Sequence, residues 1–450
     1  MVSNKRTAVV LAAGMGTRMR SNIPKVMHKI AGRSIIEHVI CCLEACGVEN
    51  IVVVVSPELL ATSDELSKYT CIIQKDRLGT GHAVKIALEE ANCLNDDIVV
   101  VCGDAPLLTP NSLDSLMMRQ QLQSGLVLMA FDSESPGSYG RVVNDGEKVK
   151  RIVEVSEASD EELDISLCNS GVLMAPGRDL LRWLRSIENK NSKGEYYLTD
   201  VIEKAVQEKC NCEFVKGEET ELLGVNTKID LANAEKILQE RYRMVAMSNG
   251  VTLQDPATTF LSFDTQFGED VHVGPFTVFG TEVKIGNNVV IKGFCHFEGA
   301  TIGNGSVIGP YARLRPGAET QQGVRIGNFV EIKNSKINNG AKINHLSYVG
   351  DAEIGESSNV GAGTITANFD GYNKSRTVLG SGVSIGSNSV LVAPVVIGDN
   401  AITGAGAIVR NDVAKDTIVV SDQKQIDLEE RASDYRKRKQ EKLQNKKEDS

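Results

Sequence analysis

The residues best suited to chemistry near the start of the chain form a glycine-containing loop and two cations. The loop reads Ala-Ala-Gly-Met-Gly-Thr-Arg over residues 12–18, and Pro24 and Lys25 follow it. Small residues let backbone N–H groups approach a phosphate, while Arg18 and Lys25 add the charge needed by a triphosphate that loses pyrophosphate. The spacing matches neither a P-loop nor a dinucleotide-binding fingerprint. A plain strand-to-helix turn remains an alternative for the loop taken alone.

A second group of reactive side chains lies in the last third of the chain. Arg315 and Lys333 are eighteen residues apart, and His345 and Tyr348 follow them. The two cations could hold a phosphate, and His345 could accept a proton near neutral pH. A solvated charge pair and a structural histidine are the plainer alternatives.

These later residues interrupt a repeat that predicts their scaffold. Between Val273 and Val409 an aliphatic residue returns about every sixth position, usually followed by Gly or another small residue. A helix would require returns at three and four, and a hairpin sheet would require strict alternation. The period of six indicates a parallel β-helix with three faces and about eighteen residues per coil. Arg315 and Lys333 should therefore lie one above the other, and the non-repeating loop 368–374 should protrude and bind ligand.

The first half of the chain shows a different pattern, in which apolar strands alternate with helices. The expected strands are 8–13, 51–56, 98–102 and 126–131, and the expected helices between them include 34–46 and 81–91. Near-continuous apolar strands are typical of a largely parallel sheet that is covered on both faces. We therefore expect a doubly wound α/β domain whose ligand lies over the carboxyl ends of the strands.

Length and composition limit the possible domain organisation, partners and location of the protein. The 450 residues divide into an α/β domain (1–227), a linker helix (228–249), a β-helix (250–428) and a basic polar tail (429–450). The net charge of −10 argues against nucleic-acid binding, and no apolar run suggests membrane insertion. Ten cysteines without paired spacing favour reduced thiols over metal-thiolate or disulfide roles. We expect a cytoplasmic protein.

The motifs also resemble known families. The pattern Leu-x-x-Gly-x-Gly-Thr-Arg from Leu11 to Arg18, followed by Pro-Lys, resembles sugar-1-phosphate nucleotidyltransferases. The hexad half is similar to hexapeptide acyltransferases, whose β-helices are mostly left-handed. In this order, and over nearly the whole chain, the two halves resemble the bifunctional N-acetylglucosamine-1-phosphate uridyltransferase/glucosamine-1-phosphate acetyltransferase family. This resemblance implies a homotrimer that acetylates glucosamine-1-phosphate with acetyl-CoA, then transfers UMP from UTP to the product and releases pyrophosphate.

The resemblance assigns roles to residues of the first half. Those expected around the uridine nucleotide and its phosphates are Leu11, Ala13, Gly14, Arg18, Lys25, Gln74, Gly79, Thr80 and Asn226, with Arg18 and Lys25 catalytic. Those expected around the sugar phosphate are Gly140, Glu154, Asn169 and Thr199. Asp104 and Asn226 are expected to hold Mg²⁺, which prefers oxygen ligands and keeps room for phosphate and water. Taken alone, Asp104 is as readily a helix cap or turn former.

The resemblance also assigns roles in the second half. His345 is the expected base for the sugar amine. The residues expected at glucosamine-1-phosphate are Arg315, Lys333, Tyr348, Asn359 and Lys374, and those expected at acetyl-CoA are Ala362, Asn368, Phe369, Ser387 and Ala405. The chain departs from the usual family residues at four positions, which are Met15 (usually Lys), Cys102 (Tyr in some relatives), Phe369 (usually Tyr) and Asp422 (usually basic).

Two alternatives to a bifunctional enzyme remain at this stage. One is a nucleotidyltransferase whose β-helix only oligomerises or regulates the protein. The other is a β-helix that serves as a scaffold or binding module without catalysis. Release of thiol from acetyl-CoA in the presence of glucosamine-1-phosphate distinguishes both alternatives from the hypothesis of a bifunctional enzyme.

Overall fold

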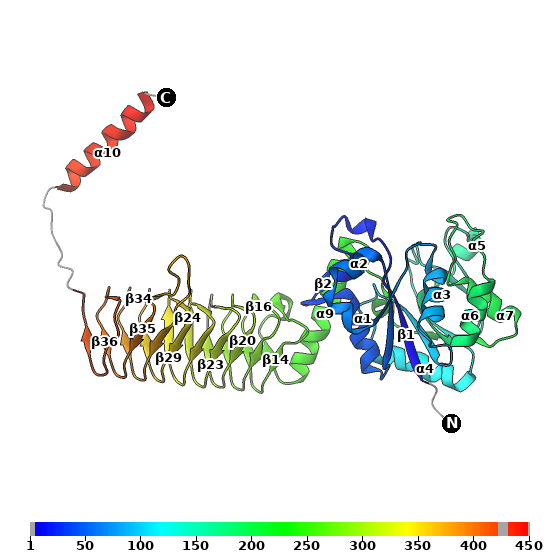
Figure 1. The fold of residues 1–450 in the computed structure, drawn as a ribbon, viewed down its shortest axis with the longest axis horizontal. Helices are drawn as coiled ribbons and strands as arrows, with labels where there is room; N and C mark the ends of the chain where they lie inside the picture. The colour runs from blue at the N-terminus through cyan, green and yellow to red at the C-terminus, as the bar shows by residue number, and fades with distance from the viewer. Residues whose placement is uncertain (1–4, 422–430, 449–450) are drawn as a thin grey trace. The chain divides into compact units, whose positions relative to one another are not determined.

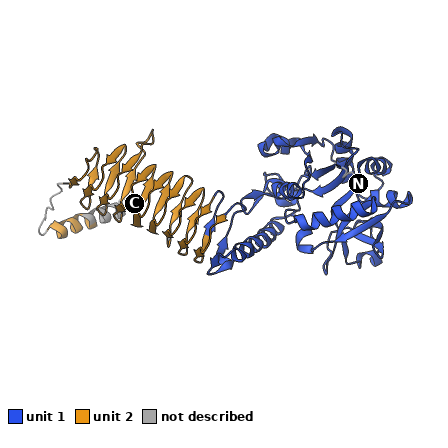
Figure 2. Cartoon of the chain, turned by 90° about the horizontal axis from the view of Figure 1, so that it is seen from below, with its two compact units in different colours: residues 1–265, 278–282 blue, residues 266–277, 283–450 orange. Residues whose placement is uncertain are grey.

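The protein folds as two compact units in a computed structural model that describes residues 5–421 and 431–448 (Figure 1). Unit 1 comprises Met1–Thr265 and Val278–Glu282, and unit 2 comprises Gln266–Thr277 and Val283–Ser450 (Figure 2). Asp422 and the expected boundary between β-helix and tail at 428–429 lie outside the described residues.

Unit 1 is built on a nine-stranded sheet with strand order β5-β4-β1-β6-β10-β7-β11-β9-β8. The strands are β1 (Arg6–Leu11), β4 (Asn50–Val55), β5 (Thr70–Ile73), β6 (Asp97–Cys102), β7 (Leu126–Asp132), β8 (Arg141–Asp145), β9 (Lys148–Val153), β10 (Leu167–Pro176) and β11 (Cys212–Lys216). Parallel pairing, as expected, joins β5, β4, β1 and β6, and also joins β7 to β11. However, β10 pairs antiparallel with both neighbours, because the chain reaches it through the β8–β9 hairpin rather than through a crossover helix.

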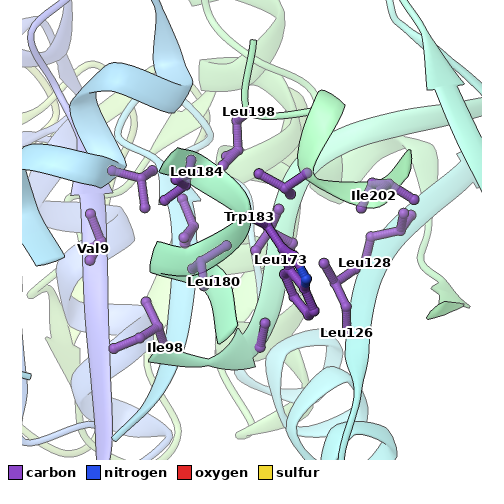
Figure 3. Close-up of a cluster of buried hydrophobic side chains, with 14 of the residues drawn as sticks. Val9, Ile98, Leu126, Leu128, Leu173, Leu180, Trp183, Leu184, Leu198 and Ile202 are labelled. Carbon is purple, nitrogen blue, oxygen red and sulfur yellow. The ribbon is translucent and has the colours of Figure 1, made fainter. Parts of the chain in front are cut away.

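Helices cover both faces of this sheet. They are α1 (Ile35–Ala45), α2 (Pro57–Thr62), α3 (Thr80–Glu90), α4 (Pro110–Gln123), α5 (Asp160–Leu163), α6 (Gly177–Ser186), α7 (Asp200–Gln207) and α8 (Glu219–Leu222). One core, formed with α3, α6 and α7, surrounds Trp183 (Figure 3). The other core lies under α1 and α4. Val9 and Val10 of β1 belong to opposite cores, because successive strand side chains point to opposite faces.

The long helix α9 (Lys228–Ser248), expected as a linker, belongs to unit 1. Its N-terminus carries a capping box in which Thr227 and Asp230 satisfy each other's backbone N–H groups. Further along, the Glu235 carboxylate accepts a hydrogen bond of 2.7 Å from the Ala31 backbone N–H. Leu238 joins a small apolar cluster beneath the helix. The helix therefore stabilises the loops that precede and follow it in unit 1.

Unit 2 is a left-handed parallel β-helix with three flat faces (Figure 1). The first face contains β15 (His272–Val273), β18 (Val290–Ile291), β21 (Val307–Ile308), β24 (Arg325–Asn328), β27 (Lys342–His345), β30 (Asn359–Val360), β33 (Ser384–Ile385), β36 (Ile402–Thr403) and β38 (Ile418–Val419). The second contains β19 (His296–Phe297), β22 (Arg313–Leu314), β25 (Glu331–Lys333), β28 (Tyr348–Gly350), β31 (Ile365–Ala367), β34 (Val390–Val392) and β37 (Ile408–Val409). The third contains β14 (Gln266–Phe267), β17 (Lys284–Ile285), β20 (Ala300–Ile302), β23 (Ala318–Thr320), β26 (Ser335–Ile337), β29 (Ala352–Ile354), β32 (Thr377–Leu379) and β35 (Val395–Ile397).

Stacked aliphatic residues fill the interior of this prism. Ile285 pairs with Ile302 seventeen residues later, whereas Ile308 pairs with Ile326 eighteen residues later. Each coil buries its aliphatic side chains against its neighbours, so the stability of a coil depends on stacking. One coil is longer, since Val360 pairs with Ile385 twenty-five residues on. The extra residues form the loop that the sequence predicts to protrude.

Beyond the β-helix, helix α10 (Arg431–Glu448) lies in the segment expected as a basic polar tail. No helix among the described residues is long and apolar enough to cross a membrane. The ten cysteines are all free thiols.

Candidate active sites

The first candidate site lies where β1 and β6 end and their loops begin. The loop after β1 is anchored by the Ala12 backbone N–H, which donates to the Val54 carbonyl at 2.8 Å. Gly16 has a left-handed φ of +60°, and a Cβ there would lie 2.6 Å from Cβ of Lys25. Only glycine permits both this conformation and this close approach. The loop therefore curls back so that Lys25 faces the end of the sheet.

A cavity of about 370 Å³ opens above these strand ends. Its lining includes these residues predicted for the nucleotide and metal: Leu11, Ala13, Gly14, Lys25, Gln74, Gly79, Thr80 and Asp104. Gly79 has a φ of +107°, and its loop is held by a 2.8 Å hydrogen bond from the Gly81 N–H to the Tyr196 carbonyl. Arg77 and Glu195 also line the cavity, although sequence reasoning missed them. A basic residue in the loop before Gly79 was the available signal for Arg77.

A second cavity of about 230 Å³ adjoins the first. All four residues predicted for the sugar phosphate, Gly140, Glu154, Asn169 and Thr199, line it. The Thr199 hydroxyl donates to the Glu154 carboxylate at 3.0 Å, which orients that carboxylate. Leu11, Thr80 and Cys102 line both cavities. The two spaces are therefore adjacent, as a nucleotide and the sugar phosphate that reacts with it require.

The predicted phosphate-binding cations and metal ligands converge near the first cavity. The Lys25 ammonium pairs with the Asp104 carboxylate, and its Nζ lies 3.1 Å from Oδ1 of Asn226. Nη2 of Arg18 lies 2.9 Å from the same oxygen. Asp104 and Asn226 thus present oxygens to a single cationic atom. Hard oxygen donors of this kind suit Mg²⁺, and among the described residues no cluster of three or more His, Cys, Asp or Glu side chains offers another metal site.

Burial sets the protonation of several groups around these cavities. Burial, together with the Asp104 charge, raises the pKa of the Cys102 thiol to about 12, so this thiol stays neutral and unreactive. Burial also raises the pKa of Tyr139, whose hydroxyl accepts a hydrogen bond from the Gly224 N–H at 3.2 Å. Burial, with the nearby charges of Glu154 and Glu203, raises the pKa of Asp200 to about 6.

The second candidate site follows two corners of the β-helix. We call the corner between the first and second faces the His345 corner. His345 ends β27 there, beside Asn328 of the coil below, and His345 Nδ1 lies 2.6 Å from Asn328 Oδ1. In the coils beyond, backbone hydrogen bonds place three residues predicted for acetyl-CoA in the same column, namely Ala362, Ser387 and Ala405. A proton on Nδ1 directed at Asn328 leaves Nε2 as the ring's acceptor.

The other residues predicted for this site belong to the second face and to the corner between the second and third faces, which we call the Lys333 corner. Arg315 follows β22, and its guanidinium pairs with Glu331 at 2.8 Å. Because β22 and β25 pair with an eighteen-residue offset, Arg315 lies one coil below Lys333, as predicted. Tyr348 lies on the second face, in β28 between the two corners.

The protruding loop starts from the Lys333 corner. The buried Asn368 side chain donates to the Asp351 carboxylate, and Phe369 bridges to Lys374 across the loop. Burial raises the pKa of Asp351, but hydrogen bonds from Asn334 and Asn368 and the charges of Lys333 and Lys374 outweigh that effect and lower it. Asp351 was missed from sequence, although it lies eighteen residues after Lys333, one coil away.

The predicted acetyl-transfer residues therefore do not form one cluster within a chain. Asn359 lies on the first face, where it pairs with Lys342 of the coil below. The His345 corner is reached three residues further along each of these coils. Arg315, Lys333, Asn368 and Lys374 belong to the opposite end of the second face. Lys342, which pairs with Asn359, and Gly350, which pairs with Lys333, are eight residues apart along one coil, so Asn359 and Lys333 lie on different faces of the prism.

Family comparisons agree with the two units. A model for the MobA-like NTP transferase domain matches residues 8–185. A model for the bacterial transferase hexapeptide repeat matches residues 264–299 and 376–411. Fold, cavities and matches together define a nucleotidyltransferase joined to a hexapeptide-repeat transferase.

Relatives similar over nearly the full length define the family more closely. The chain is 46% identical to "Bifunctional protein GlmU" of Paramagnetospirillum magneticum over 97% of this chain and 98% of the relative. It is 42% identical to the protein of that name from Zymomonas mobilis, with the same coverage. It is 44% identical to that from Azorhizobium caulinodans, over 92% and 93% of the two chains. The chain belongs to the bifunctional GlmU family, and is a uridyltransferase and acetyltransferase enzyme. Neither alternative left open by the sequence holds.

Proposed function

We propose that unit 1 joins UTP to N-acetylglucosamine-1-phosphate, and that unit 2 makes this sugar phosphate from glucosamine-1-phosphate and acetyl-CoA. The observation that carries the proposal is the pair of adjoining cavities in unit 1, with Lys25, Asp104 and Asn226 beside them. Both co-substrates are cytoplasmic metabolites, which supports the cytoplasm as the place of action.

In unit 1, the nucleotide occupies the larger cavity and the sugar phosphate the smaller. A phosphate oxygen of the sugar attacks the α-phosphorus of UTP, a new P–O bond forms, and the bond to pyrophosphate breaks. Arg18 and Lys25 stabilise the charge that develops on the departing pyrophosphate. Glu154, oriented by Thr199, and Asn169 hold the sugar hydroxyl and acetamido groups in place.

Asp104 and Asn226 are the residues that would hold Mg²⁺. Their oxygens both lie at the Lys25 ammonium, and this convergence supports the assignment of the pair to one cation. A bound Mg²⁺ supplies positive charge to the triphosphate. The Lys25 ammonium, which lies beside both oxygens, would contact the phosphates of the nucleotide.

In unit 2, His345 acts as the base for acetyl transfer. The sugar 2-amine attacks the thioester carbonyl, a C–N bond forms, and coenzyme A leaves as its thiolate. Nε2 of His345 takes the proton that the amine loses, while Asn328 fixes the ring through Nδ1. Arg315 and Lys333 neutralise the sugar phosphate. The small residues Ala362, Ser387 and Ala405 leave room along the corner for the acetyl-CoA chain.

We further propose that the acetyl-transfer site is completed by a second chain in a homotrimer. The predicted residues separate into one group at the His345 corner and another at the Lys333 corner, each with part of the acetyl-CoA set. A neighbouring chain that presents its Lys333 corner to the His345 corner reunites the groups. In a closed ring of three chains, each chain presents its Lys333 corner to one neighbour and its His345 corner to the other, so all three sites are completed.

A coupled assay tests the proposed reactions. The enzyme with glucosamine-1-phosphate, acetyl-CoA, UTP and Mg²⁺ should yield UDP-N-acetylglucosamine, pyrophosphate and free thiol. Omission of acetyl-CoA should abolish all three products, whereas N-acetylglucosamine-1-phosphate added in its place should restore UDP-N-acetylglucosamine and pyrophosphate in equal amounts, without free thiol. Pyrophosphate formed from unacetylated sugar at the same rate would contradict the assigned substrate.

A further inference from the structure

One buried side chain in the wall of the larger cavity of unit 1 is held by two hydrogen bonds. Gln74 follows β5 and is 4% exposed, yet it lines this cavity. Its amide nitrogen Nε2 lies 3.1 Å from the carbonyl oxygen of Gly79 and 3.1 Å from Nδ1 of His82. The Gly79 carbonyl also accepts the Ala83 backbone N–H at 3.2 Å. Both partners of the amide therefore belong to the start of helix α3.

These two contacts decide which end of the Gln74 amide remains for a ligand. A carbonyl oxygen can accept a hydrogen bond but not donate one, so the NH₂ group of the amide must face Gly79. The second N–H of this group is donated to His82, whose Nδ1 accepts it while the ring proton lies on Nε2. Because both N–H groups are used, the amide oxygen Oε1 is the polar atom that Gln74 can offer to a nucleotide.

An amide oxygen in a fixed direction can distinguish between pyrimidine bases. Uracil has an N–H at ring position 3, whereas cytosine has a bare nitrogen there, and the two bases also differ in the group at position 4. An acceptor held opposite position 3 forms a hydrogen bond with uracil. Opposite cytosine, two lone pairs face each other and both polar atoms stay unpaired, which is costly in a buried site. A reversed amide would present its NH₂ group and would favour cytosine instead.

We propose that His82 is a positioning residue that sets the selectivity of unit 1 for uracil over cytosine, because it holds the Gln74 amide in this direction. The inference rests on the proposed function, in which UTP occupies the larger cavity. The Gly79 carbonyl alone would leave one amide N–H unpaired and would let the amide turn about a single hydrogen bond. His82 supplies the second fixed point, and it acts on the base through Gln74.

The test replaces the acceptor atom of His82. His82→Leu puts a methyl group where Nδ1 lies, whereas His82→Asn puts an acceptor oxygen at the same place along the side chain. The measured quantity is kcat/KM for UTP divided by kcat/KM for CTP, each with N-acetylglucosamine-1-phosphate. We expect this ratio to fall roughly tenfold in His82→Leu, which is part of the discrimination that a hydrogen-bonding site can supply. It should stay close to that of the unmodified enzyme in His82→Asn and in Glu90→Leu, a control at the exposed end of α3.

The outcomes separate this inference from the proposed function. An unmodified enzyme that uses CTP as well as UTP contradicts the proposed substrate. If the unmodified enzyme prefers UTP and His82→Leu has the same ratio, the inference alone is overturned, because a purely structural role lowers both values equally. An equal loss of selectivity in His82→Asn also overturns it. If His82→Leu loses its helical circular dichroism, His82→Ala, which favours the helix, decides the question, since its ratio must fall as well.

Discussion

The two units place the residues of their candidate sites in different ways. Unit 1 gathers residues from distant strands around two adjoining cavities, so one chain brings together almost everything the uridyl-transfer site is predicted to need. Unit 2 distributes its candidate residues over two corners of a convex prism, where no single chain surrounds a ligand. The comparison teaches that a concave α/β fold can gather its candidate residues within one chain, whereas the flat faces of a β-helix separate them.

The largest effect should come from His345→Ala, which removes the base of one site only. General-base catalysis contributes roughly 10² to 10⁴ in rate, so acetyl transfer should fall by that range while uridyl transfer stays unchanged. Thiol release and pyrophosphate release, measured on the same preparation, report the two activities. His296→Ala, in the column of Tyr348 on the second face but three coils before it, is the matched control. Normal acetylation by His345→Ala would show that another group takes the proton.

The reciprocal change is Asp104→Asn in unit 1. Loss of this charge weakens Mg²⁺ binding, and uridyl transfer should fall by roughly 10² at fixed metal concentration. A magnesium titration should show a higher half-saturation concentration, with acetyl transfer unaffected. The exposed Asp145→Asn is the control. If the magnesium dependence of Asp104→Asn equals that of the unmodified enzyme, Asp104 is not a metal ligand.

A smaller effect is expected from Lys333→Ala at the second corner. The lost charge-assisted hydrogen bond is worth about 2 kcal/mol, so KM for glucosamine-1-phosphate should rise roughly thirtyfold, with a weaker change in kcat. Lys336→Ala, exposed on the third face, should leave KM unchanged. An effect on acetyl-CoA affinity alone would instead place Lys333 at the coenzyme.

The smallest effect concerns the stability of unit 1. The pKa of Asp200 is raised from 3.8 to about 6 in the folded chain. Between these values the folded state holds a proton that the unfolded state has lost, so the contribution to stability falls as pH rises. Asp200→Asn should therefore raise the free energy of unfolding at pH 7.5 by about 1 kcal/mol, after allowance for the group's half-exposed position. Calorimetry should show that the gain vanishes near pH 4, and a gain independent of pH would contradict this origin.

Much of unit 1 was predictable because its signals are local. The strand leading into residues 12–18 places backbone N–H groups at the end of a sheet, and the structure lines a cavity with them. Antiparallel β10 was not predictable, because an apolar strand looks the same in either direction. Arg77 was missed because a single cation in a loop has no partner residue at a characteristic sequence spacing that would mark it as part of a site.

In unit 2, the period of six predicted the β-helix because it reports directly which residues face inward. The corner to which a polar residue belongs is harder to predict, since the coil length varies, with offsets of seventeen and of eighteen residues. The strand register of the β-helix was therefore needed to show that Arg315 and His345 lie at different corners.

The most direct test of the central claim is complementation between two inactive chains. His345→Ala and the double variant Arg315→Ala/Lys333→Ala, co-expressed with different affinity tags and purified through both, form mixed oligomers. If one chain's His345 corner works with its neighbour's Lys333 corner, each mixed trimer contains one site with two intact halves, which is about one third of its sites. We predict that acetyl transfer recovers to about that fraction of the unmodified rate, while uridyl transfer is full throughout. Mixed oligomers as inactive as either parent would contradict a site shared between chains.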